Sequence, residues 1–200
     1  KFNIAKNEIR HEKRFLYSEK VLKISSIVFA THPDIQMRLK KDYRIISYLL
    51  FPKLNHIKIK GKNSKKIKFS GLVTDYRIIF LKRFGIILTK KKGFISINDN
   101  KIGYKYSLHP KKHLNWPYSS PIRYIYSIMI NEIPITINNF KDNFEKLISL
   151  KIKIMSEHEN FLNKYLDNIK FINKKINKYN EYIKKDYLKA IINVKKIFNK

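Results

Sequence analysis

Glycine and proline are confined to the middle of this chain of 200 residues, and their distribution constrains the fold more than any other feature. All five glycines lie between residues 61 and 103, and all six prolines lie between residues 33 and 134. The remaining stretch, 135–200, contains neither residue, a pattern that helices tolerate and successive tight turns do not. The chain therefore divides into three segments: an N-terminal helical segment over 1–52, a β-rich module with an aromatic, proline-containing loop over 53–137, and a long helical extension over 138–200.

A pair of helices is expected in the N-terminal segment. Residues 3–30 read as a helix, and the sequence THPD at 31–34 interrupts it. Pro33 suits the first turn of a second helix, which we expect to run to about Leu50. Apolar residues in this second helix recur at steps of three and four, which marks one helical face: Ile35, Leu39, Tyr43, Ile46 and Leu50.

The hydrophobic period changes to strict alternation in the middle module. Ile57 and Ile59 alternate with lysines, and Ile67 and Phe69 do so again after a short polar loop, which is typical of strands with one buried face. Further short strands are expected over 77–81, 85–89, 93–97 and 101–108. We therefore predict an antiparallel β-meander or small barrel in this module, and an α+β fold class for the whole chain.

The C-terminal extension carries a heptad-like seam in which steps of three and four alternate. The seam consists of Leu162, Tyr165, Ile169, Ile172, Ile176, Tyr179 and Ile183. One long helix or a helical hairpin folded on itself fits this pattern, and in either case the seam must be buried against a partner surface. The preceding apolar stretch, 122–137, fits a strand or a helix, although Pro134 argues against one continuous helix there.

The charge of the chain is strongly one-sided. Its 44 Lys and Arg face 15 Asp and Glu, so the formal net charge is +29 at pH 7. Residues 53–123 alone hold 18 basic and 2 acidic residues. A chain with such an excess repels itself unless a polyanion neutralises it. Nucleic acid is the first candidate, because each Lys or Arg that contacts a phosphate releases a counterion. An anionic membrane surface and an acidic protein are the next candidates.

Alternation in the predicted strands would gather lysines on the face opposite the core, and turns and the aromatic loop would extend that basic surface. Lysine outnumbers arginine in the chain, which favours contact with the nucleic-acid backbone over reading of base edges. Aromatic residues beside cations can stack on unpaired bases. The candidate RNA-binding residues are Lys58, Lys60, Lys62, Lys65, Lys66, Lys68, Arg77, Lys82, Arg83, Lys90, Lys91, Lys92, Lys111, Lys112, Trp116, Tyr118 and Arg123.

Signatures of enzyme chemistry are not found in the sequence. The chain has no cysteine, which removes thiolate nucleophiles and cysteine-based zinc sites. No phosphate-binding, nucleophile-elbow or zinc-protease motif occurs, and the carboxylates are too scattered for a metal-dependent nuclease. His109 and His113 are separated by Pro110 and two lysines, an unfavourable arrangement for a metal. We therefore expect no catalytic residues, no metal, no cofactor and no small-molecule substrate, and no apolar stretch is long enough for a membrane span.

These observations favour a non-enzymatic, structural rRNA-binding component of a ribosome. Its compact basic module with long extensions resembles ribosomal proteins in architecture, especially organellar ones, so a mitochondrial ribosome is the preferred location and another organelle or the cytoplasm the alternative. The β module would lie on the rRNA backbone, and the C-terminal helix would pack on neighbouring ribosomal proteins. Two other functions stay open: a coiled-coil scaffold or adaptor, and a peripheral subunit of an organellar membrane complex.

Overall fold

The computed structural model describes residues 9–61, 67–86, 93–95, 104–111, 120–137, 142–152 and 162–199. The chain forms two compact units. The terminal unit combines Lys1–Leu50 with Lys185–Lys200, and the central unit is Phe51–Lys184. The three segments expected from the sequence have their boundaries at residues 52 and 137. In the described part, none of the helices has the combination of length and apolarity that crossing a bilayer requires.

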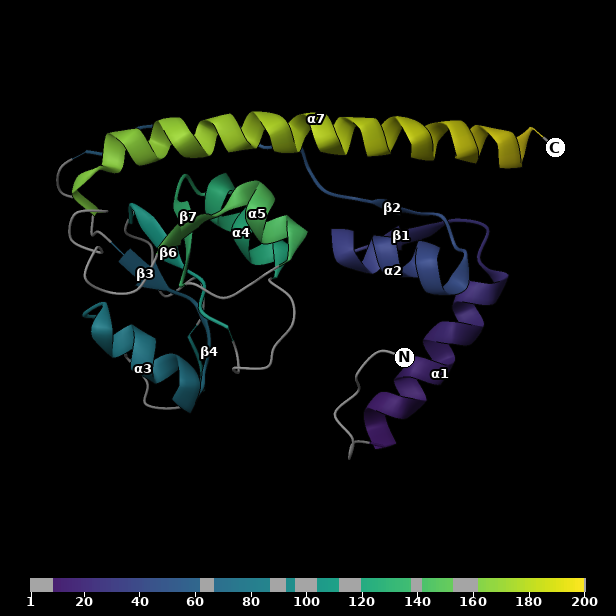
Figure 1. Ribbon diagram of the computed structural model, residues 1–200, viewed down its shortest axis with the longest axis horizontal. Coiled ribbons are helices and arrows are strands. Elements are labelled where there is room, and N and C mark those ends of the chain that lie inside the picture. The colour runs from purple at the N-terminus through teal and green to yellow at the C-terminus, as the bar shows by residue number, and fades with distance from the viewer. Residues whose placement is uncertain are drawn as a thin grey trace. The chain divides into compact units, whose positions relative to one another are not determined.

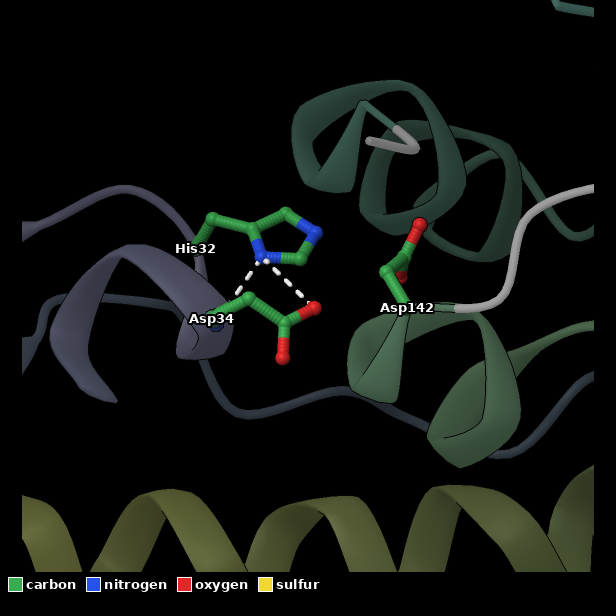
Figure 2. A group of neighbouring side chains, drawn as sticks. All are labelled: His32, Asp34 and Asp142. Atoms are coloured by element: carbon green, nitrogen blue, oxygen red, sulfur yellow. Dashed lines mark hydrogen bonds and ion pairs between the residues drawn. The ribbon is translucent and has the colours of Figure 1, made fainter. Parts of the chain in front are cut away.

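The terminal unit is built around a short parallel strand pair. Its elements are α1 (Ile9–Ile24), β1 (Val28–Ala30), α2 (Pro33–Tyr43) and β2 (Ser47–Leu49), and β1 runs parallel to β2 with Phe29 opposite Tyr48. The predicted helix start at Pro33 is confirmed. Figure 2 shows the local reason: His32 precedes the helix, and its Nδ1 accepts a hydrogen bond from the backbone N–H of Asp34 at 3.1 Å.

The second helix is shorter than the sequence predicted. It ends at Tyr43, where Arg44 adopts a left-handed conformation (φ 56°) and the N–H of Ile45 closes the last turn on the carbonyl of Leu39. The expected continuation to Leu50 is therefore wrong. The three residues of β2 are all buried, so pairing with β1 and burial outweigh the helical spacing of the sequence.

The central unit contains a four-stranded sheet in which all strands are parallel. Its order is β3 (Ile67–Phe69), β6 (Tyr106–Leu108), β7 (Ile133–Ile137) and β8 (Leu150–Ile152). Helix α4 (Pro121–Met129) connects β6 to β7, and α5 (Asn143–Ile148) connects β7 to β8. A separate antiparallel pair consists of β4 (Gly71–Val73) and β5 (Gly93–Ile95). The chain is thus mixed α and β, as predicted, but the predicted antiparallel meander or barrel is wrong.

Two local features explain this correction. Residues 77–81, expected to be a strand, belong to helix α3 (Asp75–Arg83), whose N-terminus is capped by the Thr74 hydroxyl, which accepts from the N–H of Arg77 at 3.3 Å. Residues 56–60, also expected to be a strand, form none. Alternation of apolar and polar residues shows which side of a strand is buried. It does not show whether the neighbouring strands run parallel or antiparallel to it, and parallel strands are joined by long crossover connections.

The C-terminal extension is only partly helical, which corrects the prediction of helix from 138 onward. Its first part holds α5 and β8, and helix α7 (Tyr165–Phe198) follows as one continuous helix of 34 residues. The helical hairpin is therefore excluded. The predicted seam is buried from Tyr165 to Ile183, while Leu162, before the helix, is half-buried.

Aromatic rings hold the first half of α7 against the central unit. Figure 1 shows this half beside α4 and α5, and ring contacts support the view. Phe144 of α5 makes edge-on contacts with Tyr179 of α7 at 6.3 Å, with Tyr124 of α4 at 6.0 Å and with Phe51 at 5.6 Å between ring centroids. All four rings thereby join α4, α5 and α7 in one core.

Asparagine side chains on α7 take the place of a neighbouring strand for residues 51–60. Asn180 accepts from the N–H of Leu54 and donates to its carbonyl, both at 2.9 Å. Asn173 forms the same pair with the backbone of Ile57, at 2.8 and 3.1 Å. A side-chain amide presents one donor and one acceptor, as a peptide unit does. This explains how an extended segment without a sheet partner satisfies its backbone.

Candidate functional site

The carboxyl ends of the four parallel strands lie along one edge of the central sheet, where ligands of open α/β sheets bind. Ser70 directly follows β3 and His109 directly follows β6. Because Phe69 pairs with Leu108, and Leu108 with Ile135, the next residues along each strand lie in one row. That row consists of Ser70, His109 and Thr136, all buried polar residues.

Two arginines lie at this edge, Arg77 buried and Arg123 half-buried. Arg77 comes from the first turn of α3, and its guanidinium donates to the carbonyls of Leu72 at 2.7 Å, Lys111 at 3.1 Å and Pro110 at 3.2 Å. It thereby ties the end of β4 to the segment after β6. Burial, followed by repulsion from Arg123, lowers the pKa of Arg77 to about 10.

Arg123, in the first turn of α4, approaches the same edge from the other side. Its Nη2 donates to the carbonyl of Ser70. Its guanidinium lies 5.6 Å from the centre of the Phe69 ring, and the guanidinium of Arg77 lies 5.5 Å from the same centre. Phe69 thus contacts both cations. Burial lowers the pKa of Arg123 to about 10.

Gly71 makes room for Arg123. A Cβ atom at Gly71 would lie 3.1 Å from Nη2 of Arg123, and the residue has φ +131°, which L side chains rarely adopt. Backbone and guanidinium therefore approach each other more closely here than another residue would permit.

His109 is neutral, and its tautomer follows from its hydrogen bonds. The Ser127 hydroxyl donates to the carbonyl of Arg123 at 2.9 Å, so it has no second proton for His109 Nε2, which lies 2.9 Å from the same oxygen. Nε2 must carry the proton, and Nδ1 is left as an acceptor. Burial first, and then the charges of Arg123, Arg77 and Lys68, lower the pKa of His109 well below its ordinary value.

Three buried polar atoms at this edge have no hydrogen-bond partner among the described residues: Ser70 Oγ, His109 Nδ1 and the Tyr124 hydroxyl. The rings of His109 and Tyr124 stack with centroids 4.7 Å apart. Burial, then Glu145 and Asp142, raise the pKa of the Tyr124 hydroxyl well above its ordinary value. It is therefore a protonated donor. Unpaired buried polar atoms are uncommon and often mark a place where an ion or ligand binds.

Helix α4 begins at the same edge, because it follows β6 in the chain. Its N-cap Ser120 makes no side-chain capping bond, and Pro121 occupies its first turn. The first N–H groups of a helix carry partial positive charge and attract anions. The positive end of α4 therefore adds to the field of Arg123, which lies in the same turn.

Acidic side chains in the described part of the edge have hydrogen-bond partners other than the two arginines. Glu145 Oε1 accepts from the Thr136 hydroxyl at 2.7 Å. Asp142, drawn in Figure 2 at the start of α5, accepts from the N–H of Glu145 at 2.8 Å as the N-cap. Among the described residues, neither Arg77 nor Arg123 forms an ion pair with a carboxylate. The two arginines thus bring positive charge, that of Arg77 buried, which these hydrogen bonds do not pair.

The structure describes eight of the seventeen candidate RNA-binding residues, and these differ in exposure. Lys58 and Lys82 are exposed, Lys111 is half-buried, and Arg83 lies in α3. Arg77 and Arg123 lie together at the edge described above, where the carbonyl of Lys111 accepts from Arg77. The other predicted positions of loops and turns lie outside the described residues: Lys62, Lys65, Lys66, Lys90, Lys91, Lys92, Lys112, Trp116 and Tyr118.

Two of the predicted surface lysines point inward. Lys68 Nζ lies 2.8 Å from Glu132 Oε1, and both side chains are buried. Lys60 Nζ donates to the carbonyl of Tyr104 at 2.6 Å, and burial lowers its pKa. Ile59, expected in the core, is 68% exposed. The predicted lysine face opposite an isoleucine face is therefore not formed, because residues 56–60 do not pair in a sheet.

Sequence reasoning missed Ser70, His109 and Tyr124 as site residues. A polar residue that directly follows a buried strand is a usable signal for the first two, once parallel strands are expected.

Comparison of the chain with protein-family models, with curated proteins and with solved structures finds no match.

Proposed function

We propose that the central unit binds a small ligand that carries a phosphate group, at the carboxyl edge between β3 and β6. The observation that carries this proposal is the pair of arginines at this edge, Arg77 buried and Arg123 half-buried, without a carboxylate partner among the described residues. A phosphate balances such charge and accepts several hydrogen bonds from guanidinium and helix N–H groups. This departs from the sequence-based expectation of no small-molecule substrate.

A nucleotide is the class of phosphate-bearing ligand that this architecture favours. Open parallel sheets hold mono- and dinucleotides in the crevice outside the strand ends, with the phosphate against a helix N-terminus. The choice rests on the fold rather than on a motif. The neutral His109 and the protonated Tyr124 hydroxyl supply one acceptor and one donor for the uncharged part of the ligand.

The proposed roles of the two arginines differ. Arg77 uses its guanidinium on three backbone carbonyls, so it shapes the edge and contributes charge. Arg123 has a single bond to the carbonyl of Ser70 among the described residues. Its other N–H groups are the proposed contacts to phosphate oxygens, beside the N-terminus of α4.

Arg123→Gln should weaken nucleotide binding at least about tenfold, because one charge-assisted contact to phosphate contributes roughly 1.5–3 kcal/mol. Titration calorimetry with a panel of nucleoside diphosphates and with inorganic pyrophosphate measures this. Lys82→Gln is the matched control. It also removes one positive charge, and Lys82 is exposed near the end of α3. Failure of the whole panel to bind the unmodified protein, or an equal loss in both variants, would contradict the proposal.

A structural role on rRNA is the second proposal, and the net charge of +29 supports it. The described part of the chain exposes lysines outside the edge as well, among them Lys58, Lys82 and Lys178. The coiled-coil alternative has less support, because the seam from Tyr165 to Ile183 is buried within the chain itself.

If the rRNA proposal holds, the protein should sediment with ribosomal particles at low salt and leave them at high salt, because counterion release makes phosphate contacts salt-dependent. Gradient fractionation of native lysate at two salt concentrations measures this. Sedimentation of the protein near the top of both gradients would count against a ribosomal role while leaving the nucleotide proposal standing.

A further inference from the structure

The last turns of α7 expose large apolar side chains in the terminal unit. Figure 1 shows this end of the helix at the C-terminus of the chain. Six such residues face solvent, with Phe198 81% exposed. We name them the tail surface: Tyr187, Leu188, Ile191, Ile192, Ile197 and Phe198. Exposed apolar side chains grouped on one helix commonly mark an interaction site.

An apolar hollow adjoins the tail surface within the same unit. It has a volume of about 290 Å³, and its lining includes Leu49, Ala190, Ile191 and Val194. Phe29 of β1 and Leu50 also line it and are themselves exposed. The apolar surface thus continues from the helix onto the strand pair.

Exposed lysines flank the tail surface along α7. Lys185, Lys189, Lys195 and Lys196 are all exposed. Among residues 185–199 the one acidic residue is Asp186, whose carboxylate accepts from the N–H of Leu49 at 2.5 Å and from Gln36 Nε2 at 3.1 Å. Its charge therefore stabilises the terminal unit and leaves the exposed positive charge uncompensated on this helix face.

We propose that the tail surface docks onto an anionic phospholipid surface. Lysines have long aliphatic stems that let the ammonium groups reach lipid headgroups while neighbouring apolar side chains enter the acyl boundary. Each lysine near an anionic bilayer adds attraction that salt screens. A nucleic acid would use the charge but would gain little from burying Leu188, Ile192 and Phe198, whereas the acyl boundary of a bilayer accepts all three.

Vesicle co-sedimentation tests the proposal with the whole chain. Binding is expected to vesicles of phosphatidylcholine with phosphatidylglycerol and not to phosphatidylcholine alone. Leu188→Ser/Ile192→Ser/Phe198→Ser should reduce binding at least tenfold, and so should Lys189→Gln/Lys195→Gln/Lys196→Gln. The matched control is Lys170→Gln/Lys174→Gln/Lys178→Gln, which removes three exposed lysines from the part of α7 in the central unit. Equal loss in the control would overturn the assignment of this surface.

Insertion distinguishes a lipid surface from another polyanion. Phe198→Trp, in a chain whose only tryptophan is removed by Trp116→Phe, places one fluorophore on the tail surface. Brominated lipid in anionic vesicles should quench its emission. Adsorption without quenching, with equal binding to polyglutamate or to RNA, would overturn the proposal and indicate an acidic macromolecule. Nucleotide binding at the central unit is measured separately, so the two proposals fail independently.

Discussion

Phe144→Ala should lower the free energy of unfolding of the central unit by about 3–5 kcal/mol, the range for removal of a buried phenylalanine. The ring has no exposed surface. It contacts Tyr124, Tyr179 and Phe51 edge-on, so one substitution removes three aromatic contacts and leaves a cavity between α4, α5 and α7. Native-state hydrogen exchange of amides in β6 and β7 measures this change for the central unit alone.

Phe171→Ala is the matched control for this prediction. Phe171 lies on α7 and is 52% exposed, so the same change of side chain should alter stability by about 0.5 kcal/mol or less. Similar losses in the two variants would show that the Phe144 cluster does not hold α7 against the sheet. A large loss confined to Phe144→Ala would place the junction of three helices at this ring.

Local periodicity predicted the helix that this cluster anchors. The steps of three and four from Tyr165 to Ile183 identified a buried seam, and α7 buries it. The start of α2 at Pro33 was predictable for a similar reason, because capping and proline act within one turn. Both features depend on residues that are close in the chain.

Features that depend on distant residues were not predictable in this way. The segment 77–81 is a different case: this apolar run was expected to be a strand, although the residues that start its helix, Thr74 and Asp75, lie close to it in the chain. The side chains of Lys68 and Glu132 pair across 63 intervening residues, and no pattern in the chain indicates the pairing.

The site edge was missed because strand pairing decides it. Ser70 and His109 follow their strands directly. In the antiparallel meander that was predicted, the strands expected over 77–81, 85–89 and 93–97 lie between these two strands, so the two residues would be separated. In the parallel sheet β3 pairs with β6, and the two residues lie side by side. The error in strand pairing therefore became an error in the site.

Glu132→Gln should destabilise the central unit by about 3–5 kcal/mol, because it leaves the Lys68 ammonium buried without its counter-charge. Lys68 Nζ and Glu132 Oε1 lie 2.8 Å apart, and the two side chains are 5% and 2% exposed. Lys82→Gln is the control for the loss of a charged side chain, because Lys82 is exposed to solvent. Chemical denaturation followed by hydrogen exchange in β3 and β7 measures both.

Replacing both partners should be far less costly. Lys68→Met/Glu132→Leu removes the ion pair together with its desolvation cost, and stability is expected within about 1 kcal/mol of the unmodified protein or above it. A double variant as unstable as Glu132→Gln would mean that packing, not unpaired charge, explains the single change. The double variant thus separates the two causes.

The dependence of stability on pH gives an independent check of the same pair. Burial raises the pKa of Glu132 above its ordinary value of 4.5, although Lys68 and Lys60 oppose the shift. Between 4.5 and the raised value, the folded protein keeps a proton that the unfolded chain has released, so stability falls as pH rises through this window. Lys68→Met/Glu132→Leu lacks this carboxyl group. The free energy of unfolding of the double variant, relative to that of the unmodified protein, should therefore increase with pH across the window. A constant difference between the two proteins would show that Glu132 titrates alike in both states and that its burial carries no such cost.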